Sequence, residues 1–97
     1  EKLEIEQTKE IQGSQEDTLL KTASNFYYTG EYDSAKENYT KYFEIKKNKK
    51  DSLGIAKGFQ GLGLIFDAQG KYKDALNNYV NALKIYEKFS DSGFLII

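Results

Sequence analysis

The chain repeats a pattern of small and aromatic residues at a spacing of 40 residues. Six positions keep their residue across this spacing within one window of 14 residues, and Ile45 likewise returns as Ile85. The repeated positions are Phe26/Phe66, Gly30/Gly70, Tyr32/Tyr72, Ala35/Ala75, Asn38/Asn78 and Tyr39/Tyr79. A fixed period of this length is typical of arrays of stacked helical hairpins, because one hairpin cannot bury its own apolar face. Arrays of this kind usually bind other proteins.

The composition removes most of the side chains on which enzymes depend. The 97 residues include no cysteine and no histidine, and all 14 basic residues are lysines. The commonest metal ligand and general base at neutral pH is therefore missing, and so is the thiolate that serves as a nucleophile. No other nucleophile stands beside a candidate base in the sequence. We predict that the chain is not an enzyme, with no catalytic residue, no metal and no cofactor.

The charge and hydropathy of the chain argue against nucleic-acid and membrane partners. The formal net charge is −1, so no long-range field attracts nucleic acid or anionic lipid. The most apolar stretches, 61–66 and 94–97, are far too short to span a bilayer. The lysine-rich run 46–50 allows two interpretations, a nucleic-acid or lipid patch and a solvated helix end whose lysines complement the helix dipole. We favour the helix end, because the run lacks arginine and interleaved aromatic residues; the cellular compartment stays undetermined.

Hydrophobic periodicity predicts four helices, over 16–29, 33–47, 54–69 and 73–89. The chain contains no proline, which suits a fold made almost wholly of helices. Gly30 and Gly70 are expected to end the first and third helices in the left-handed conformation. The spaced glycines at 58, 61 and 63 resemble a phosphate-binding loop only loosely, because no strand precedes them. We interpret them as sites of close helix packing.

The repeat register predicts a single domain over residues 1–97, with the two complete repeats at 16–50 and 56–90. Leu3 and Ile5 stand 40 residues before Phe43 and Ile45, so we interpret 1–12 as part of the second helix of a preceding repeat. Residues 91–97 would begin a following repeat that is cut short. The alternative is an unrelated capping helix at the start and a frayed tail at the end.

The second unit resembles the tetratricopeptide repeat in its small and aromatic positions. The matching motif is Leu62-Gly63-x₂-Phe66-x₃-Gly70-x-Tyr72-x₂-Ala75-x₃-Tyr79-x₂-Ala82-Leu83. The first unit fits less well, because Tyr42 stands where that family favours alanine. The resemblance implies an all-α fold, a right-handed stack of antiparallel helical hairpins, in which Gly63 and Ala75 have almost no accessible surface. The 40-residue period is similar to that of an extended subclass found in bacterial signalling proteins.

The resemblance also implies a partner-binding groove lined by the first helix of each repeat. By analogy its residues are Asp17, Leu20, Ser24, Tyr27 and Tyr28 in the first repeat, and Lys57, Gln60, Leu64, Asp67 and Ala68 in the second. Tyr27 and Tyr28 suit interface anchors; the alternative is that one of the two, with Tyr28 as readily packed as exposed, merely packs between helices. The predicted function is a protein–protein interaction module that binds a peptide or helix, within a bacterial signalling or regulatory protein. The alternative is a ligand- or peptide-responsive sensor segment that controls a kinase or DNA-binding output domain.

The apolar end of the chain predicts a further contact. Phe94, Leu95, Ile96 and Ile97 would leave large side chains in water, which forgoes roughly 1.5–3 kcal/mol of burial for each. The segment either folds back on its own chain or meets a second molecule, and we favour self-association.

Overall fold

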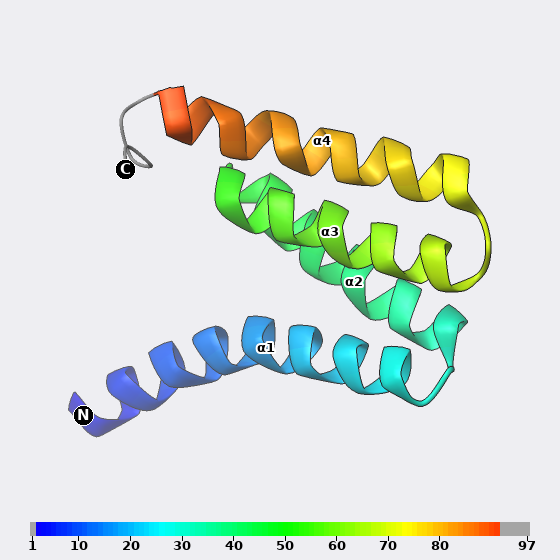
Figure 1. The fold of residues 1–97 in the computed structure, drawn as a ribbon. Helices are drawn as coiled ribbons and strands as arrows, with labels where there is room; N and C mark the ends of the chain where they lie inside the picture. The colour runs from blue at the N-terminus through cyan, green and yellow to red at the C-terminus, as the bar shows by residue number, and fades with distance from the viewer. Residues whose placement is uncertain (1, 92–97) are drawn as a thin grey trace.

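The structure is a computed structural model that describes the backbone of residues 2–91 and the side chains of residues 15–90. It consists of four helices: α1 (Lys2–Tyr28), α2 (Tyr32–Asn48), α3 (Ser52–Ala68) and α4 (Tyr72–Asp91). The helices form two antiparallel hairpins, α1–α2 and α3–α4, and each helix packs against the next one in the chain (Figure 1). Residues 2–91 contain no strand. The predicted all-α fold of stacked hairpins is confirmed.

Three of the four helices have nearly the predicted bounds, whereas α1 begins much earlier. It is one continuous helix from Lys2, and it runs through the position at which the sequence predicted a new helix to begin. Nothing in the connecting sequence stops a helix, since the segment has no proline and one glycine costs only about 1 kcal/mol. The assignment of 1–12 to a preceding repeat or cap stays a prediction. The predicted contact of 94–97 lies outside the described residues.

The three interhelical turns share one hydrogen-bonded motif, the Schellman C-cap. In each turn the residue with positive φ donates its amide proton three residues back, and the next residue donates five residues back, over distances of 2.8–3.2 Å. Gly30 and Gly70 take φ of +82° and +77°, which confirms the predicted helix ends. The middle turn uses Lys50, with φ of +56°, in a conformation that a side chain disfavours.

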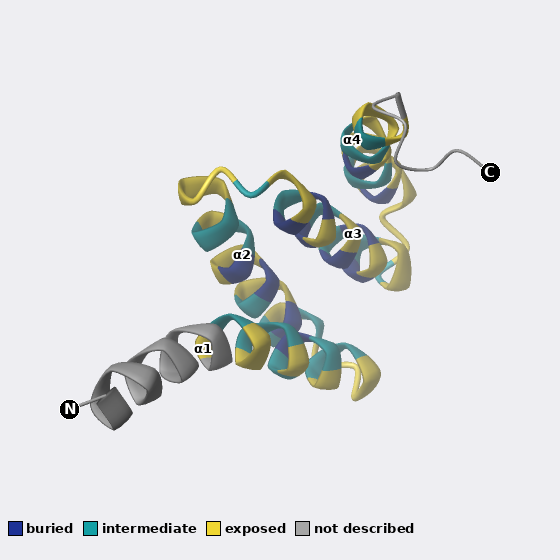
Figure 2. Cartoon of the chain, turned by 90° about the vertical axis from the view of Figure 1, so that its left-hand side faces the viewer, coloured by how far each residue is buried: buried dark blue, intermediate teal, exposed yellow. Residues whose placement is uncertain are grey.

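Small residues and tyrosines form the buried interior. A continuous cluster joins Ala23 of α1, Ala35 and Tyr39 of α2, and Ile65 of α3 (buried residues are dark blue in Figure 2). Tyr42 is 4% exposed, so this tyrosine packs inside the stack although the family favours alanine there. The other buried apolar residues are Ala56, Ala75 and Ala82. Ala75 is 3% exposed and Gly63 is buried, as predicted.

Four glycines let α3 lie close to both of its neighbours. Three of them, one or two turns apart, meet α2, and the fourth meets α4. A Cβ atom added at Gly54, Gly58, Gly61 or Gly63 would lie 2.5 Å from Lys46, 2.9 Å from Phe43, 2.5 Å from Tyr39 or 2.6 Å from Tyr79, respectively. The interpretation of these glycines as packing sites is confirmed, and they hold α3 between α2 and α4.

Candidate functional site

The predicted groove residues of α1 lie along one side of its C-terminal half, with different exposures. Asp17 is exposed, and Leu20 and Ser24 are intermediate. Leu20 and Tyr27 pack against the buried cluster of α1, α2 and α3, whereas Tyr28 is 81% exposed. We call the ten predicted groove residues of α1 and α3 together the first-helix face.

The two tyrosines differ in their surroundings: Tyr27 is packed between helices, and Tyr28 is exposed. The Tyr27 ring lies edge-on to the Tyr28 ring, with centroids 5.3 Å apart, and 6.1 Å from the Tyr32 ring of α2. Of the two candidates for an interhelical position, Tyr27 is therefore the one that packs. Tyr28 stands largely in solvent and touches the Tyr27 ring.

The residues of the first-helix face on α3 are all exposed. They are Lys57, Gln60, Leu64, Asp67 and Ala68. Leu64 is 39% exposed, and Leu53, which the sequence did not single out, is 44% exposed. The Gln60 Oε1 atom accepts a hydrogen bond of 2.8 Å from the Tyr86 hydroxyl of α4. Gln60 is therefore joined to α4 through its side-chain oxygen.

A tyrosine of α4 reaches the part of α3 that carries Asp67. The Tyr79 ring lies over Gly63, whose missing side chain leaves room for it. Burial raises the pKa of the Tyr79 hydroxyl, and the Asp67 carboxylate and the Tyr27 hydroxyl raise it further. In the sequence, Tyr79 was named only as part of the repeat motif, because the groove was assigned to residues of the first helix of each repeat.

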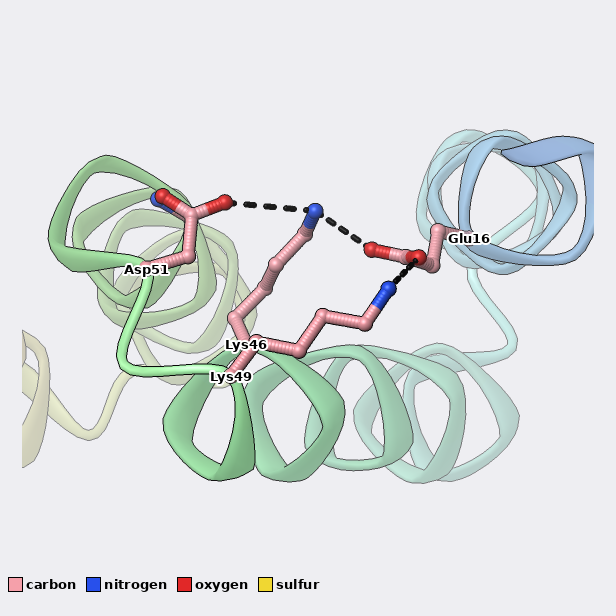
Figure 3. Close-up of polar contacts among 5 residues, drawn as sticks. Glu16, Lys46, Lys49 and Asp51 are labelled. Carbon is pink, nitrogen blue, oxygen red and sulfur yellow. Dashed lines mark hydrogen bonds and ion pairs between the residues drawn. The ribbon is translucent and has the colours of Figure 1, made fainter. Parts of the chain in front are cut away.

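A network of ion pairs joins α1, α2 and the start of α3 (Figure 3). The Glu16 carboxylate of α1 pairs with Lys46 and, at 2.5 Å, with Lys49, and both lysines belong to the end of α2. The Lys46 Nζ also lies 3.3 Å from Asp51 Oδ2, and Asp51 caps α3 by accepting the Gly54 amide proton at 3.1 Å. The side chains of Glu16 and Lys46 are only 13% and 17% exposed.

Hydrogen bonds within this network favour the charged forms. The hydrogen bond from Lys46 and, as the second cause, that from Lys49 lower the pKa of Glu16. The hydrogen bond to Glu16 raises the pKa of Lys46. The Gly54 amide, with a smaller effect from Lys46, lowers the pKa of Asp51. Two carboxylates meet two ammonium groups, so the charges balance and the arrangement is structural. The interpretation of the lysine run as a solvated helix end was incomplete, because two of its lysines bind α1.

A surface depression of about 400 Å³ lies beside the network and is lined by Gln15, Glu16, Ile45 and Lys49. None of the predicted groove residues lines it. Among the described residues, no group of three acidic, histidine or cysteine side chains is placed to hold a metal ion. No helix of the described chain is long and apolar enough to cross a membrane.

Comparison with known families matches residues 14–88 to the tetratricopeptide repeat. The match covers both hairpins, including the end of α1 and nearly all of α4. No curated protein and no solved structure was found to match the chain. The family is one of interaction modules, so its members typically bind proteins rather than catalyse reactions. With its glycine-ended turns, small packing residues and two stacked hairpins, the chain belongs to the tetratricopeptide repeat family.

Proposed function

We propose that the chain is a protein–protein interaction module that binds one segment of a partner protein, a peptide or a helix, on the first-helix face. Tyr28 of α1 anchors the partner, and Leu64 and Asp67 of α3 complete the contact. The membership of the family supports the general function, and the exposures of these residues support the surface.

The observation that carries the proposal is the exposure of Tyr28. Its ring is 81% exposed, yet it rests against Tyr27, which is itself packed on the core. A tyrosine buries a large area at low cost in conformational entropy, because it has only two rotatable side-chain bonds. Aromatic residues of this kind carry much of the binding energy in protein interfaces.

The neighbouring residues indicate the chemistry of the partner segment. Leu64 offers partly exposed apolar surface, and Asp67 follows it by three residues, which places both on one side of α3. Two carboxylates, Asp17 and Asp67, stand against the single ammonium of Lys57 on this face. We expect an amphipathic helix or extended peptide with an apolar anchor and a nearby lysine or arginine.

The proposal is tested with a panel of synthetic peptides of about 15 residues, each with an apolar residue three or four positions from a basic one. Binding is measured by fluorescence anisotropy, and the contact surface by changes in backbone amide NMR shifts. We expect the largest shifts at the first-helix face. Tyr28→Ala should weaken the tightest peptide at least about tenfold, equivalent to about 1.4 kcal/mol, without changing the helical content.

Tyr72→Ala is the matched control, because Tyr72 is a second well-exposed tyrosine, 68% accessible, on α4. It should leave peptide affinity unchanged. The proposal fails if Tyr28→Ala binds as tightly as the unchanged chain, or if the bound peptide shifts only amides of α2 and α4.

The narrower parts of the functional prediction rest on the sequence resemblance alone. These are the origin in a bacterial signalling or regulatory protein and the alternative role as a sensor segment for an output domain. They stay predictions.

A further inference from the structure

The Asp67 carboxylate is exposed on α3 and forms no ion pair with any side chain that the structure describes. Lys57, the lysine of the first-helix face, stands ten residues earlier, about 15 Å along the helix axis. Lys71 lies in the turn after α3 and is not paired with Asp67 either. Lys36 of α2 places its ammonium group over the Phe66 ring, 5.2 Å from the ring centre. Within the described part of the chain, the charge of Asp67 therefore has no direct partner.

A hydroxyl group of α4 reaches the same side of α3. The Cζ atom of Tyr79, which carries the hydroxyl, would lie 3.1 Å from a Cβ atom added at Gly63. Asp67 follows Gly63 by four residues, so the two positions share one side of the helix, one turn apart. Tyr79 is half-buried, and its hydroxyl forms no hydrogen bond to another described residue. Its oxygen is therefore available as an acceptor.

Tyr27 supplies a second hydroxyl group from α1. It stands 40 residues before Asp67, so the two residues hold the same position on the first helices of the two repeats. Equivalent positions of neighbouring repeats lie next to each other in a stacked array, and Tyr27 packs against the cluster that contains Ile65 of α3. Burial, followed by the Asp67 carboxylate and the Tyr27 hydroxyl, raises the pKa of Tyr79. Three oxygen-bearing groups from three helices thus gather on one part of the first-helix face.

We propose that Tyr27, Asp67 and Tyr79 form a subsite for one lysine side chain of the partner segment, an inference that rests on the function proposed above. We call these three residues the lysine subsite. An ammonium group has three N–H donors and no acceptor, and the subsite offers three oxygen-bearing groups and one negative charge. Arginine fits less well, because its planar fork suits the two oxygens of one carboxylate better than three separate groups.

The apolar stem of the bound lysine lies along Leu64. This leucine is 39% exposed and precedes Asp67 by three residues, which places the two side chains next to each other. Lysine commonly buries its stem on apolar surface while its charged end stays in a polar environment. The equivalent positions of the first repeat hold Ser24 and Tyr27, which offer no carboxylate. The first repeat therefore has no second copy of the subsite.

Substitution of the basic residue in the tightest peptide of the panel tests the subsite from the side of the partner. Lysine should bind at least about tenfold more tightly than norleucine, which keeps the stem and lacks the charge. Trimethyllysine keeps the charge but has no N–H donor, and should bind at least about fivefold more weakly than lysine. Arginine should bind at least about threefold more weakly than lysine.

Variants of the chain then locate the bound lysine through double-mutant cycles. Asp67→Asn should reduce the preference for lysine over norleucine to within about twofold. Tyr79→Phe removes the hydroxyl but keeps the ring over Gly63, and should reduce the preference at least about threefold. The matched controls are Tyr39→Phe, at the equivalent position of α2, and Glu44→Gln, an exposed carboxylate of α2. Both should leave the preference unchanged, and circular dichroism will verify that all four variants fold.

The possible outcomes separate the lysine subsite from the function on which it rests. A peptide that binds with a lysine preference below about twofold would refute the subsite alone. So would a preference that survives both Asp67→Asn and Tyr79→Phe, because the lysine would then lie elsewhere. Equal binding of trimethyllysine and lysine would overturn the hydrogen-bonded ammonium in favour of a purely electrostatic contact. Failure of every peptide to bind would refute the proposed function, and the subsite with it.

Discussion

Gly61→Ala introduces a single methyl group at one of the two tightest points between α2 and α3. The new Cβ would lie 2.5 Å from both Cδ1 and Cε1 of Tyr39, whereas carbon atoms in good contact are about 3.5–4.0 Å apart. The Tyr39 ring is 6% exposed and belongs to the buried cluster of three helices. About 1 Å of displacement is therefore required of a ring that has little free space.

Two opposing terms set the size of the effect. Alanine in a helix interior is favoured over glycine by about 0.8–1 kcal/mol, which would stabilise the variant. Overpacking a well-filled core typically costs about 1–3 kcal/mol, and the short contact places this site in the upper part of that range. We expect a net loss of about 1–2 kcal/mol in the free energy of unfolding, or roughly 5–10 °C in Tm for a domain of this size.

Urea unfolding followed by circular dichroism measures the loss, with Lys57→Ala as a control one turn earlier on the exposed side of α3. That control should stay within about 0.5 kcal/mol of the unchanged chain. Combining Gly61→Ala with Tyr39→Ala removes the clashing ring, so the double variant should be more stable than the sum of the single effects by more than about 1 kcal/mol. A Gly61→Ala chain about 1 kcal/mol more stable than the original would mean that helix propensity alone acts there, and would refute the packing argument.

The remaining predictions concern the middle turn and the ion-pair network. Lys50→Gly should raise the free energy of unfolding by about 0.5–1 kcal/mol, because glycine accepts the φ of +56° without strain. Lys49→Gly, at a φ of −82°, should not stabilise the chain in the same urea titration. Glu16→Gln should lower the free energy of unfolding at neutral pH by roughly 1 kcal/mol. Because the folded pKa of Glu16 lies below 4.5, its contribution is present above that pH and is lost as the pH falls through the folded value. The variant should therefore show a weaker fall in stability with acid than the unchanged chain, and an identical acid profile would contradict this role.

The sequence predicted those features that depend on local residue types. Gly30 and Gly70 marked two helix ends because few other residues accept a positive φ at a C-cap. Ala75 and Gly63 marked tight helix contacts because a small residue repeated at one register position is rarely accidental in a stacked array. Each of these residues sets the backbone conformation of its own segment or the distance to which a neighbouring helix can approach it. Its residue type alone therefore predicts the local structure.

The features that the sequence did not reveal depend on distant residues. Lys50 takes the conformation of its glycine counterparts, yet a lysine gives no sign of a left-handed residue. Glu16 meets Lys46 across 30 residues of chain, and a lysine-rich helix end looks the same with or without such a partner. The exposure of Tyr28 rather than Tyr27 is likewise set by the neighbouring helix, which residue type alone does not indicate.

The surface proposed on α3 follows from how that helix is held. Its glycines bind it closely to α2 on one side and to α4 through Gly63 on another, which leaves Leu64 and Asp67 of α3 exposed.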